Sequence, residues 1–406
     1  MTHDASFVAE RSPYATHWIL DPAVRFLNHG SFGACPRPVL AAQAAVREQL
    51  ERQPVRFFVR ELPDLLAAAR AAFAGFLGAR AEDLALVTNA STGVNTVLRA
   101  LELSPGDELL VTDQEYNATR NAVEFAARRA GARVRVVALP FPIAGPEEVL
   151  ERVLAAVTPK TRLAVLDHVT SQTGLILPVE ALVAGLRERG VETLVDGAHG
   201  PGMLPLALDR LGAAYYTGNA HKWICAPKGA AFLHVRSDMQ ERTPPLVISH
   251  GANAPLDARH SRFRLLHEWT GTRDPSAWLV IAEAIAFMGG LLPGGWEELR
   301  ARNHETCLYG QEVICAALEI DRPAPPSMIG SLAAFPLPDG DPAGMNPPFY
   351  VDPLQDALAL RHHVEVPVFP WPAPPRRLLR ISAQLYNGRG EYDALAAALR
   401  GELGRG

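Results

Sequence analysis

Short runs of apolar and β-branched residues alternate with longer segments of helical periodicity through the middle of the chain. The β-rich runs cover residues 83–89, 107–113, 133–140, 162–169, 192–199 and 229–235. Between most of them, apolar residues recur at a spacing near 3.6, as in 92–103, 118–131 and 178–190. Strands that alternate with helices are typical of a mostly parallel sheet covered on both faces. We therefore expect a large α/β domain over residues 60–270.

The alternation ends near "MGGLLPGGW", residues 288–296. Beyond it, a helical pattern is followed by a Pro-rich stretch and by the final run "LLRISAQLYN". This order favours a linker helix and a smaller α+β domain over residues 271–406, and we expect residues 1–59 to pack on that domain. The Pro- and Gly-rich stretch at 336–349 is predicted to be a loop.

Polar residues gather where the predicted strands end, and ligands of open α/β sheets bind beyond the carboxyl ends of the strands. The clusters are Asn89 with Ser91 and Thr92, Glu115 with Tyr116, His168 with Gln172, Asp196 with His199, and Thr217 to Lys222. Turn chemistry or helix capping is the simpler explanation of any one of these residues. Five clusters on successive strand ends favour a single binding site.

The residue types in these clusters match the parts of one ligand. Backbone N–H groups and hydroxyls in "NASTGVNTVL" suit a phosphate, and Tyr116 suits a flat ring. Asp196 suits a heteroaromatic nitrogen that must stay protonated, and Lys222 supplies an amine for an aldehyde. Lys222 is one of only three lysines among 39 basic residues, which weakens its explanation as a solvated surface lysine. Together these parts describe pyridoxal 5′-phosphate.

Composition and charge exclude several other classes of protein. A net charge of −5 offers no basic surface for nucleic acid. Residues 1–20 are polar and mixed in charge, unlike a signal peptide, and the chain has no run of about 18 apolar residues, so no membrane span is expected. Four cysteines without metal-ligand or disulfide spacing favour a reducing cytoplasm. His250, His362 and His363 lack a third ligand at useful spacing, so we expect no metal site.

The segment "VDGAHGPGMLPLALDRLGAAYYTGNAHKWICAPKGAAFL" resembles the cofactor signature of the class V aminotransferases. Further segments are similar to the isopenicillin N epimerase-like branch of that family: residues 26–40, 88–99, 113–121, 167–179 and 378–387. The resemblance runs in order from about residue 24 to residue 395. It implies the pyridoxal phosphate-dependent transferase fold type I, in which a large domain with a mostly parallel seven-stranded sheet between helices is joined to a smaller α+β C-terminal domain.

The resemblance implies catalytic roles for four residues. Lys222 forms the Schiff base with the cofactor and shuttles the proton at the substrate α-carbon, and Asp196 pairs with the pyridine nitrogen. Tyr116 stacks on the ring, and His199 lies near the ring hydroxyl. The implied reaction passes through an external aldimine and a quinonoid intermediate.

Residues that hold the cofactor and the substrate are also implied by the resemblance. Further cofactor-binding residues are Ser91, Thr92, Gln172, Asn219 and His221, joined by Gly271 and Thr272 from the second subunit. Because each site borrows from the partner, a homodimer with shared active sites is expected. Arg380 is expected to clamp the carboxylate of a small amino acid substrate, with help from Asn28. His29 either contacts the ligand or only packs the loop.

Several reactions share the same first steps. Inversion at the α-carbon makes an epimerase or racemase, loss of a β-substituent makes a C–S lyase for a sulfur-containing amino acid, and proton return to the cofactor makes an aminotransferase. A persulfide-forming cysteine desulfurase is disfavoured, because residues 361–380 contain no cysteine. An epimerase needs a second base, for which Tyr116, His29 and Tyr386 are candidates. An isopenicillin N epimerase-like epimerase or racemase is the favoured function.

A non-catalytic regulator of the same fold is the remaining alternative. Such proteins carry a DNA-binding helix-turn-helix extension, and the sequence leaves no room for one before Phe26 or after Leu385. A scaffold without catalysis would be expected to lose Lys222 or Asp196, and both are present. The sequence therefore favours an enzyme.

Overall fold

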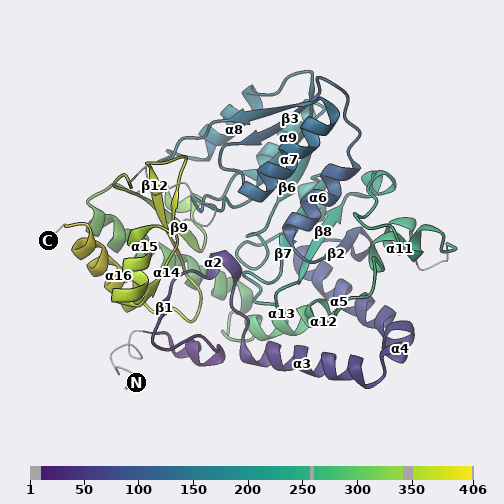
Figure 1. The fold of residues 1–406 in the computed structure, drawn as a ribbon, viewed down its shortest axis with the longest axis horizontal. Coiled ribbons are helices and arrows are strands. Elements are labelled where there is room, and N and C mark those ends of the chain that lie inside the picture. Colours follow the sequence, from purple (N-terminus) through teal and green to yellow (C-terminus); the bar gives the residue numbers. More distant parts are fainter. Residues whose placement is uncertain (1–10, 257–259, 342–350, 405–406) are drawn as a thin grey trace.

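A seven-stranded sheet lies at the centre of the computed structural model, which describes residues 11–256, 260–341 and 351–404 (Figure 1). In spatial order, its strands are β2 (Leu84–Val87), β8 (Ala231–Val235), β7 (Tyr215–Asn219), β6 (Glu192–Asp196), β5 (Thr161–Asp167), β3 (Glu108–Thr112) and β4 (Arg133–Val137). Neighbouring strands pair in parallel except at β8, which runs antiparallel to β2 and β7. The predicted fold class is confirmed, and all six β-rich runs of the sequence form strands of this sheet.

Helices cover both faces of the sheet. They are α5 (Leu62–Leu77), α6 (Ala90–Ala100), α7 (Asn117–Ala130), α8 (Pro146–Ala155) and α9 (Val179–Glu188). Ala85 and Val87 of β2 pack with α6 and α7, whereas Leu84 and Leu86 pack in the core that contains α5, α8 and α9. The residues of β2, β3, β7 and β8 are all buried, as a sheet covered on both sides requires.

Further helices precede α5 or follow α9 along the chain. They are α2 (His29–Phe32), α3 (Arg37–Arg52), α4 (Pro54–Arg56), α10 (Leu208–Leu211), α11 (Arg262–Glu268), α12 (Ser276–Leu279) and α13 (Ile281–Gly289). The long helices α3 and α5 both pack against α12 and α13, along the lower side of Figure 1. No helix in the described part of the chain is both long enough and apolar enough to cross a bilayer.

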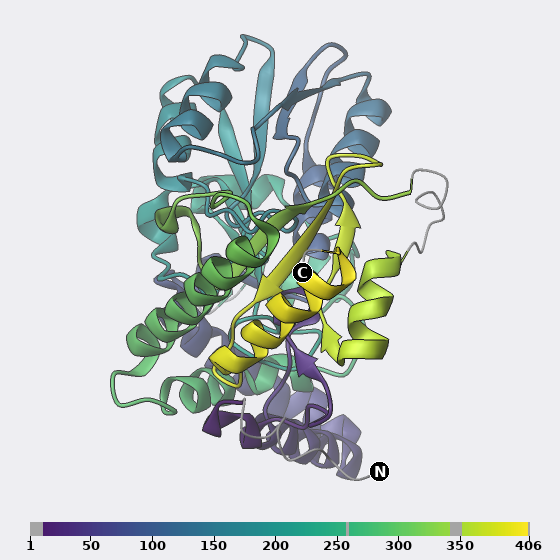
Figure 2. The ribbon, with the colours of Figure 1, turned by 90° about the vertical axis from the view of Figure 1, so that its left-hand side faces the viewer.

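The C-terminal part is smaller and contains an antiparallel sheet in the order β11-β12-β9. Its elements are β9 (Leu332–Leu337), β11 (Val368–Pro370), β12 (Arg377–Ser382), α14 (Gly295–Leu318), α15 (Pro353–His362) and α16 (Arg389–Glu402). Helices α14 and α16 lie side by side in front of this sheet in Figure 2. Strand β1 (Arg25–Phe26) pairs in parallel with β10 (Val364–Glu365), so the N-terminal segment joins this part of the molecule. The domain boundaries at 59/60 and 270/271 stay predictions.

The loop predicted at 336–349 begins later than expected. Pro336 and Leu337 are the last two residues of β9, where Pro336 lies opposite Leu378 of β12. An edge strand tolerates proline because its outer side needs no N–H donor, and β9 lies at the edge of its sheet. Residues 342–349 of the stretch lie outside the described residues.

Candidate active site

The polar clusters meet at the carboxyl ends of the parallel strands. Asp167, Asp196 and Asn219 are the last residues of β5, β6 and β7, which are adjacent in the sheet. Tyr116 begins the helix that follows β3. The parallel arrangement thus brings together residues that are up to 103 positions apart, from 116 to 219, as expected of this sheet edge.

The loop that carries Lys222 is held in a fixed conformation. Cys225 has a left-handed backbone, with a φ of 61°, and its N–H donates to the Lys222 carbonyl at 3.0 Å. Gly33 of the N-terminal segment lies against the same loop with a φ of +72°, and a Cβ added there would stand 2.1 Å from the His221 oxygen. Only glycine fits this approach, and the sequence analysis did not single it out.

A hydrogen-bond chain determines the protonation of Lys222. The indole N–H of Trp223 donates to His199 Nδ1 at 3.2 Å, so a neutral His199 carries its proton on Nε2. That Nε2–H lies 3.0 Å from Lys222 Nζ and can donate only to an uncharged amine. Burial lowers the pKa of His199 well below its usual range and, together with Arg380, lowers the pKa of Lys222 to about 7. Lys222 is therefore available as a neutral nucleophile and base near neutral pH.

Three buried carboxyl groups form a cluster, and the charges of two of them, Asp167 and Asp196, act on Lys222. Oxygen atoms of Glu115, Asp167 and Asp196 lie within 4.8 Å of one another, and burial is the main cause that raises all three pKa values. Asp196 accepts hydrogen bonds from Thr119 Oγ1 at 2.7 Å and from the Ala198 N–H at 3.1 Å, and forms no ion pair with a described residue. A protonated ring nitrogen would supply the cation that Asp196 lacks, so this carboxylate fits pyridoxal phosphate.

Two of these three acids were not assigned a role from the sequence. Both oxygens of Glu115 and Oδ2 of Asp167 are buried without a hydrogen-bond partner among the described residues. The sequence feature that could have pointed to Asp167 is an acidic residue at the end of an otherwise apolar run, "LAVLDHV".

Ser91 and Thr92, which are predicted to bind the phosphate, lie in the first turn of α6. Asn89 caps the helix by accepting from the Thr92 N–H at 2.8 Å, and Asn219 Oδ1 accepts from the Ala90 N–H at 2.9 Å. His221 Nδ1 donates to the Ala230 carbonyl at 3.2 Å, which leaves Nε2 for a ligand. Half-buried Ser91 lies in the same turn, so Ser91, Thr92 and Asn219 meet at a helix N-terminus, a site that suits a phosphate, whereas no hydrogen bond joins His221 to this turn among the described residues.

Arg380 of β12 is a buried cation without a carboxylate partner. Its side chain is held by the Ser171 carbonyl and, at 3.0 Å, by Ser31 Oγ, which in turn donates to Asn28 Oδ1 at 2.6 Å. Arg380 is 4% exposed, burial lowers its pKa to about 10, and no ion pair joins it to a described acid. A buried guanidinium in this state is suited to a carboxylate from a ligand. Ser31 and Ser171 were not predicted.

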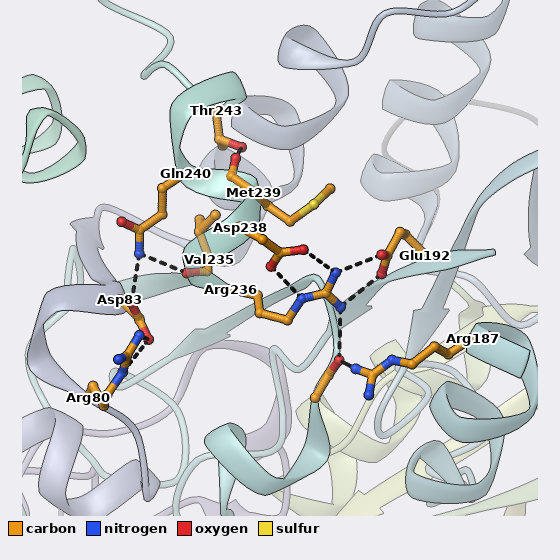
Figure 3. Close-up of polar contacts among 11 residues, drawn as sticks. Arg80, Asp83, Arg187, Glu192, Val235, Arg236, Asp238, Met239, Gln240 and Thr243 are labelled. Carbon is orange, nitrogen blue, oxygen red and sulfur yellow. Dashed lines mark hydrogen bonds and ion pairs between the residues drawn. The ribbon is translucent and has the colours of Figure 1, made fainter. Parts of the chain in front are cut away.

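Arg236 shows how a partly buried arginine is satisfied elsewhere in this molecule. Figure 3 shows its guanidinium between the carboxylates of Glu192, at 2.6 Å, and Asp238, at 2.6 Å. It also donates to the Gly212 carbonyl at 3.2 Å. Arg380 differs from Arg236 in having no such carboxylate among the described residues.

The structure does not bring every predicted residue toward the ligand. His29 is fully buried, and its two ring nitrogens lie 2.9 Å from the Tyr386 hydroxyl and 2.9 Å from the Lys222 carbonyl. These contacts favour the packing role for His29. The Gln172 Oε1 is buried without a hydrogen-bond partner among the described residues. Thr272 is exposed, and within the described chain no hydrogen bond joins it or Gly271 to the other site residues.

Two groups outside this site that could be weighed as metal ligands make contacts with other side chains of the protein. Asp83, Asp209 and His234 place possible metal-ligand atoms within 4.8 Å of one another. Asp83 already accepts hydrogen bonds from Arg80, at 2.7 Å, and from Gln240, at 2.7 Å, as Figure 3 shows. His362, which the sequence analysis weighed as a metal ligand, lies 2.8 Å from a Glu402 oxygen.

The sequence is similar to a known family of enzymes and to several of its members. The family model described as "Aminotransferase class-V" matches residues 36–393. An isopenicillin N epimerase of Amycolatopsis lactamdurans is 41% identical over 94% of this chain and 96% of its own length. A putative L-cysteine desulfhydrase 2 of Oryza sativa subsp. japonica is 33% identical over 96% of this chain and 86% of its own length.

Solved structures share the fold. A mutant of C-DES with glycine covalently linked to its pyridoxal phosphate cofactor has a TM-score of 0.76 and 24% identity, and the match covers 93% of this chain and 96% of that one. The predicted cofactor and enzyme class are confirmed by the family to which these relatives belong. Because the family match covers most of the described chain and the site fits the cofactor, the chain belongs to the class V aminotransferase family of pyridoxal phosphate-dependent enzymes.

Proposed function

We propose that the protein is an isopenicillin N epimerase-like epimerase or racemase, which inverts the configuration at the α-carbon of an amino acid. One observation carries the proposal. A buried amine that its hydrogen bonds keep neutral, Lys222, shares a site with a buried guanidinium that lacks a carboxylate partner, Arg380. The amine can move the α-proton and the guanidinium can hold the α-carboxylate. The 41% identical isopenicillin N epimerase supports inversion as the outcome.

The residues of the site divide the work of binding and proton transfer. Pyridoxal phosphate, when bound, supplies an aldehyde that takes up an amino group and a cationic ring that withdraws electrons from the α-carbon. Asp196 keeps the ring nitrogen protonated, and Ser91, Thr92 and His221 hold the phosphate at the start of α6. Lys222 Nζ removes the proton from the α-carbon.

Orientation of the substrate falls to Arg380. Ser31 and Ser171 hold the guanidinium from two sides, so the remaining N–H groups point in a fixed direction. A carboxylate held by this guanidinium is placed at a defined distance from Lys222. The two side chains are near each other, because the charge of Arg380 contributes to the lowered pKa of Lys222. The arrangement requires a free α-carboxylate on the substrate.

Inversion needs a second acid–base group, and we assign this role to Tyr116. The other two candidates from the sequence, His29 and Tyr386, are buried and hydrogen-bonded to each other. Tyr116 is 42% exposed, and its phenol interacts electrostatically with Arg380, which lies near the bound carboxylate in this proposal. Its ring can stack on the cofactor, while its hydroxyl exchanges a proton with the α-carbon.

The Tyr116→Phe variant tests this proposal, because it keeps the ring and removes only the hydroxyl. Wild type and variant are incubated with a panel of L- and D-amino acids in deuterated water. Wild type is expected to invert its substrate and to place deuterium on the α-carbon from either enantiomer. The variant should exchange the α-proton of one enantiomer, through Lys222, and should no longer invert it.

Tyr309→Phe is the matched control, since that hydroxyl donates to Asp393 on α16 and lies outside the site. Unchanged inversion by Tyr116→Phe would remove the role of Tyr116. A wild-type enzyme that releases sulfide and a keto acid without inverting any amino acid would overturn the epimerase itself.

A second candidate function is β-elimination from a sulfur-containing amino acid. The 33% identical L-cysteine desulfhydrase homologue favours it. Elimination uses the same proton removal by Lys222 but needs no base on the opposite face. Tyr116→Phe should therefore leave lyase turnover nearly unchanged, which separates the two functions in one assay.

We further propose a homodimer in which Gly271 and Thr272 complete the site of the partner. Exposed Thr272 and the open space around Gly271, where a Cβ would meet nothing within 4 Å, support a contact made outside the single chain. The four free, buried cysteines support a reducing compartment such as the cytoplasm.

A further inference from the structure

A small cavity lies between α5, β2 and the segment 264–278, outside the site described above. Apolar side chains of Leu66, Leu84 and Leu86 form part of its wall, and Trp278 also lines it. The space open to the centre of a water-sized sphere is about 10 Å³, so the cavity takes one small molecule or ion. The polar residues in the rest of the wall determine which molecule or ion can bind there.

Unpartnered nitrogen atoms line this cavity. Arg70 Nε, Arg264 Nε and both ring nitrogens of His267 are buried without a hydrogen-bond partner among the described residues. Arg70 is 3% exposed and His267 is 6% exposed, so bulk water does not satisfy them. Burial, with the charges of Arg70 and Arg273, lowers the pKa of His267 to about 4, so its ring is neutral and offers one N–H. Most of these atoms are donors, which calls for an acceptor in the cavity.

The charged side chains that line the cavity do not balance, although Glu82, outside the lining, also acts on Arg70. Three arginines line it, and Glu268 is the one acid that lines it. Glu268 is shared by Arg70, at 2.7 Å, and Arg264, at 2.6 Å. Arg273 stacks over Trp278 and donates to the Thr270 hydroxyl, and no ion pair joins it to a described acid. An excess of positive charge in a buried space is costly unless an anion offsets it.

We propose that the cavity binds a monovalent anion of the size of chloride. A neutral water molecule would satisfy the donors but would leave the excess charge, and a phosphate is too large for the volume. The anion would bridge α5, through Arg70, to α11, through Arg264 and His267, and would also interact with Arg273. Because Arg273 follows Thr272, the bound anion would also order the segment that, in the proposed dimer, reaches the site of the partner. This last consequence rests on the proposed function, whereas anion binding does not.

Bromide is the probe for a direct test. Crystals of the full-length holoenzyme grown or soaked in sodium bromide should show an anomalous peak in the cavity, within hydrogen-bond distance of Arg70, Arg264 or His267. An anomalous map without that peak, with an ordered water in its place, overturns the proposal. The result does not depend on which reaction the enzyme catalyses.

Thermal stability provides the second measurement. At constant ionic strength, replacing sodium gluconate by sodium chloride should raise the Tm of the holoenzyme by about 2–4 °C, because the anion binds the folded state. Arg264→Gln should reduce this chloride-dependent shift, and Glu268→Gln, which removes the competing acid, should increase it. Opposite changes in the two variants are not expected of a merely structural defect.

Arg236→Gln is the matched control, because Arg236 is another partly buried arginine with its own carboxylates, Glu192 and Asp238 (Figure 3). It should lower the Tm but leave the chloride-dependent shift unchanged. If Arg264→Gln does not fold, the bromide map and the Glu268→Gln variant still decide the question. A chloride-dependent shift that is the same in wild type and Glu268→Gln contradicts the proposal.

Discussion

The protonation of Lys222 decides at which pH the site can act. Burial and the charge of Arg380 lower the pKa of this amine to about 7. Below that value the fraction of neutral amine falls about tenfold per pH unit, and above it the amine stays neutral. We therefore predict that the rate at which the apoprotein takes up pyridoxal phosphate rises up to about pH 7 and is constant from about pH 8 to 9.

Stopped-flow absorbance follows this uptake. Lys222→Ala should show no absorbance change of a lysine-bound cofactor, whereas Lys160→Ala, which alters an exposed lysine before β5, should behave as wild type. A rate that continues to rise up to pH 10 would indicate a lysine with an ordinary pKa, and would contradict the neutral amine deduced from His199 and Trp223.

The second prediction at this scale concerns Arg380. Arg380→Ala should weaken substrate binding by about 2–5 kcal/mol, the range observed when one partner of a buried charge pair is truncated. The loss should appear as a higher KM in steady-state kinetics for every amino acid that is turned over. Arg376→Ala changes an exposed arginine four positions earlier and should leave KM unchanged. An unaltered KM in Arg380→Ala would place the carboxylate elsewhere.

At the scale of elements, the loop of Lys222 depends on the approach of the N-terminal segment. Gly33→Ala would combine a left-handed φ of +72° with a Cβ only 2.1 Å from the His221 oxygen. The loop or the segment must then move, and we predict a loss of about 1–3 kcal/mol in the free energy of unfolding beyond the cost of the backbone conformation. Cofactor affinity should fall as well, because the displaced residues adjoin Lys222.

Gly190→Ala separates the two effects. Gly190 has the same φ of +72°, but a Cβ there would meet nothing within 4 Å. This control should cost only the backbone strain, about 1–2 kcal/mol, and should keep cofactor affinity. Denaturant unfolding and cofactor titration measure both quantities. Equal effects of the two variants would show that the close approach at Gly33 does not matter.

Residues of the site that belong to one element could be predicted from the sequence, whereas contacts between distant elements could not. The strands of the large sheet were predictable because apolar runs and helical periodicity are local, and Lys222 and Asp196 could be found because their residue types match one cofactor. Ser31 and Ser171 carry no such signal. They meet Arg380 across separations of 349 and 209 residues, which only the assembled fold defines. The same holds for Gly33, whose role depends on a segment far along the chain.

The whole molecule adds information that neither residues nor elements contain. The parallel order of β5, β6 and β7 aligns their ends, so the position of Asp196 at a strand end could be predicted together with its chemistry. It could not separate the three candidates for a second base, because His29, Tyr386 and Tyr116 lie on different parts of the chain. His29 and Tyr386 are buried and in contact with each other, whereas Tyr116 is exposed, and this difference is the basis for proposing Tyr116.

A dimer with shared sites has a consequence for mixtures of inactive variants. If Thr272 acts in the partner's site, a heterodimer of Lys222→Ala with Thr272→Asp contains one site with both defects and one site with none. The two variants are each predicted to be inactive, because an acid at residue 272 repels the phosphate. Unfolded and refolded together, they should regain roughly a quarter of wild-type activity, since half of the dimers are mixed and each has one intact site.

The same mixture distinguishes this arrangement from one in which Thr272 serves its own chain. In that case every site of a heterodimer carries one defect, and no activity returns. Thr88→Asp is the control: Thr88 Oγ1 lies 2.9 Å from Thr92 Oγ1 in the proposed phosphate turn of the same chain as Lys222, so an acid there should also inactivate the enzyme. Mixed with Lys222→Ala, this variant should not restore activity. Sedimentation of the wild-type protein should give a dimer. A monomer at micromolar concentration would contradict shared sites directly, because Gly271 and Thr272 would then have no partner site to complete.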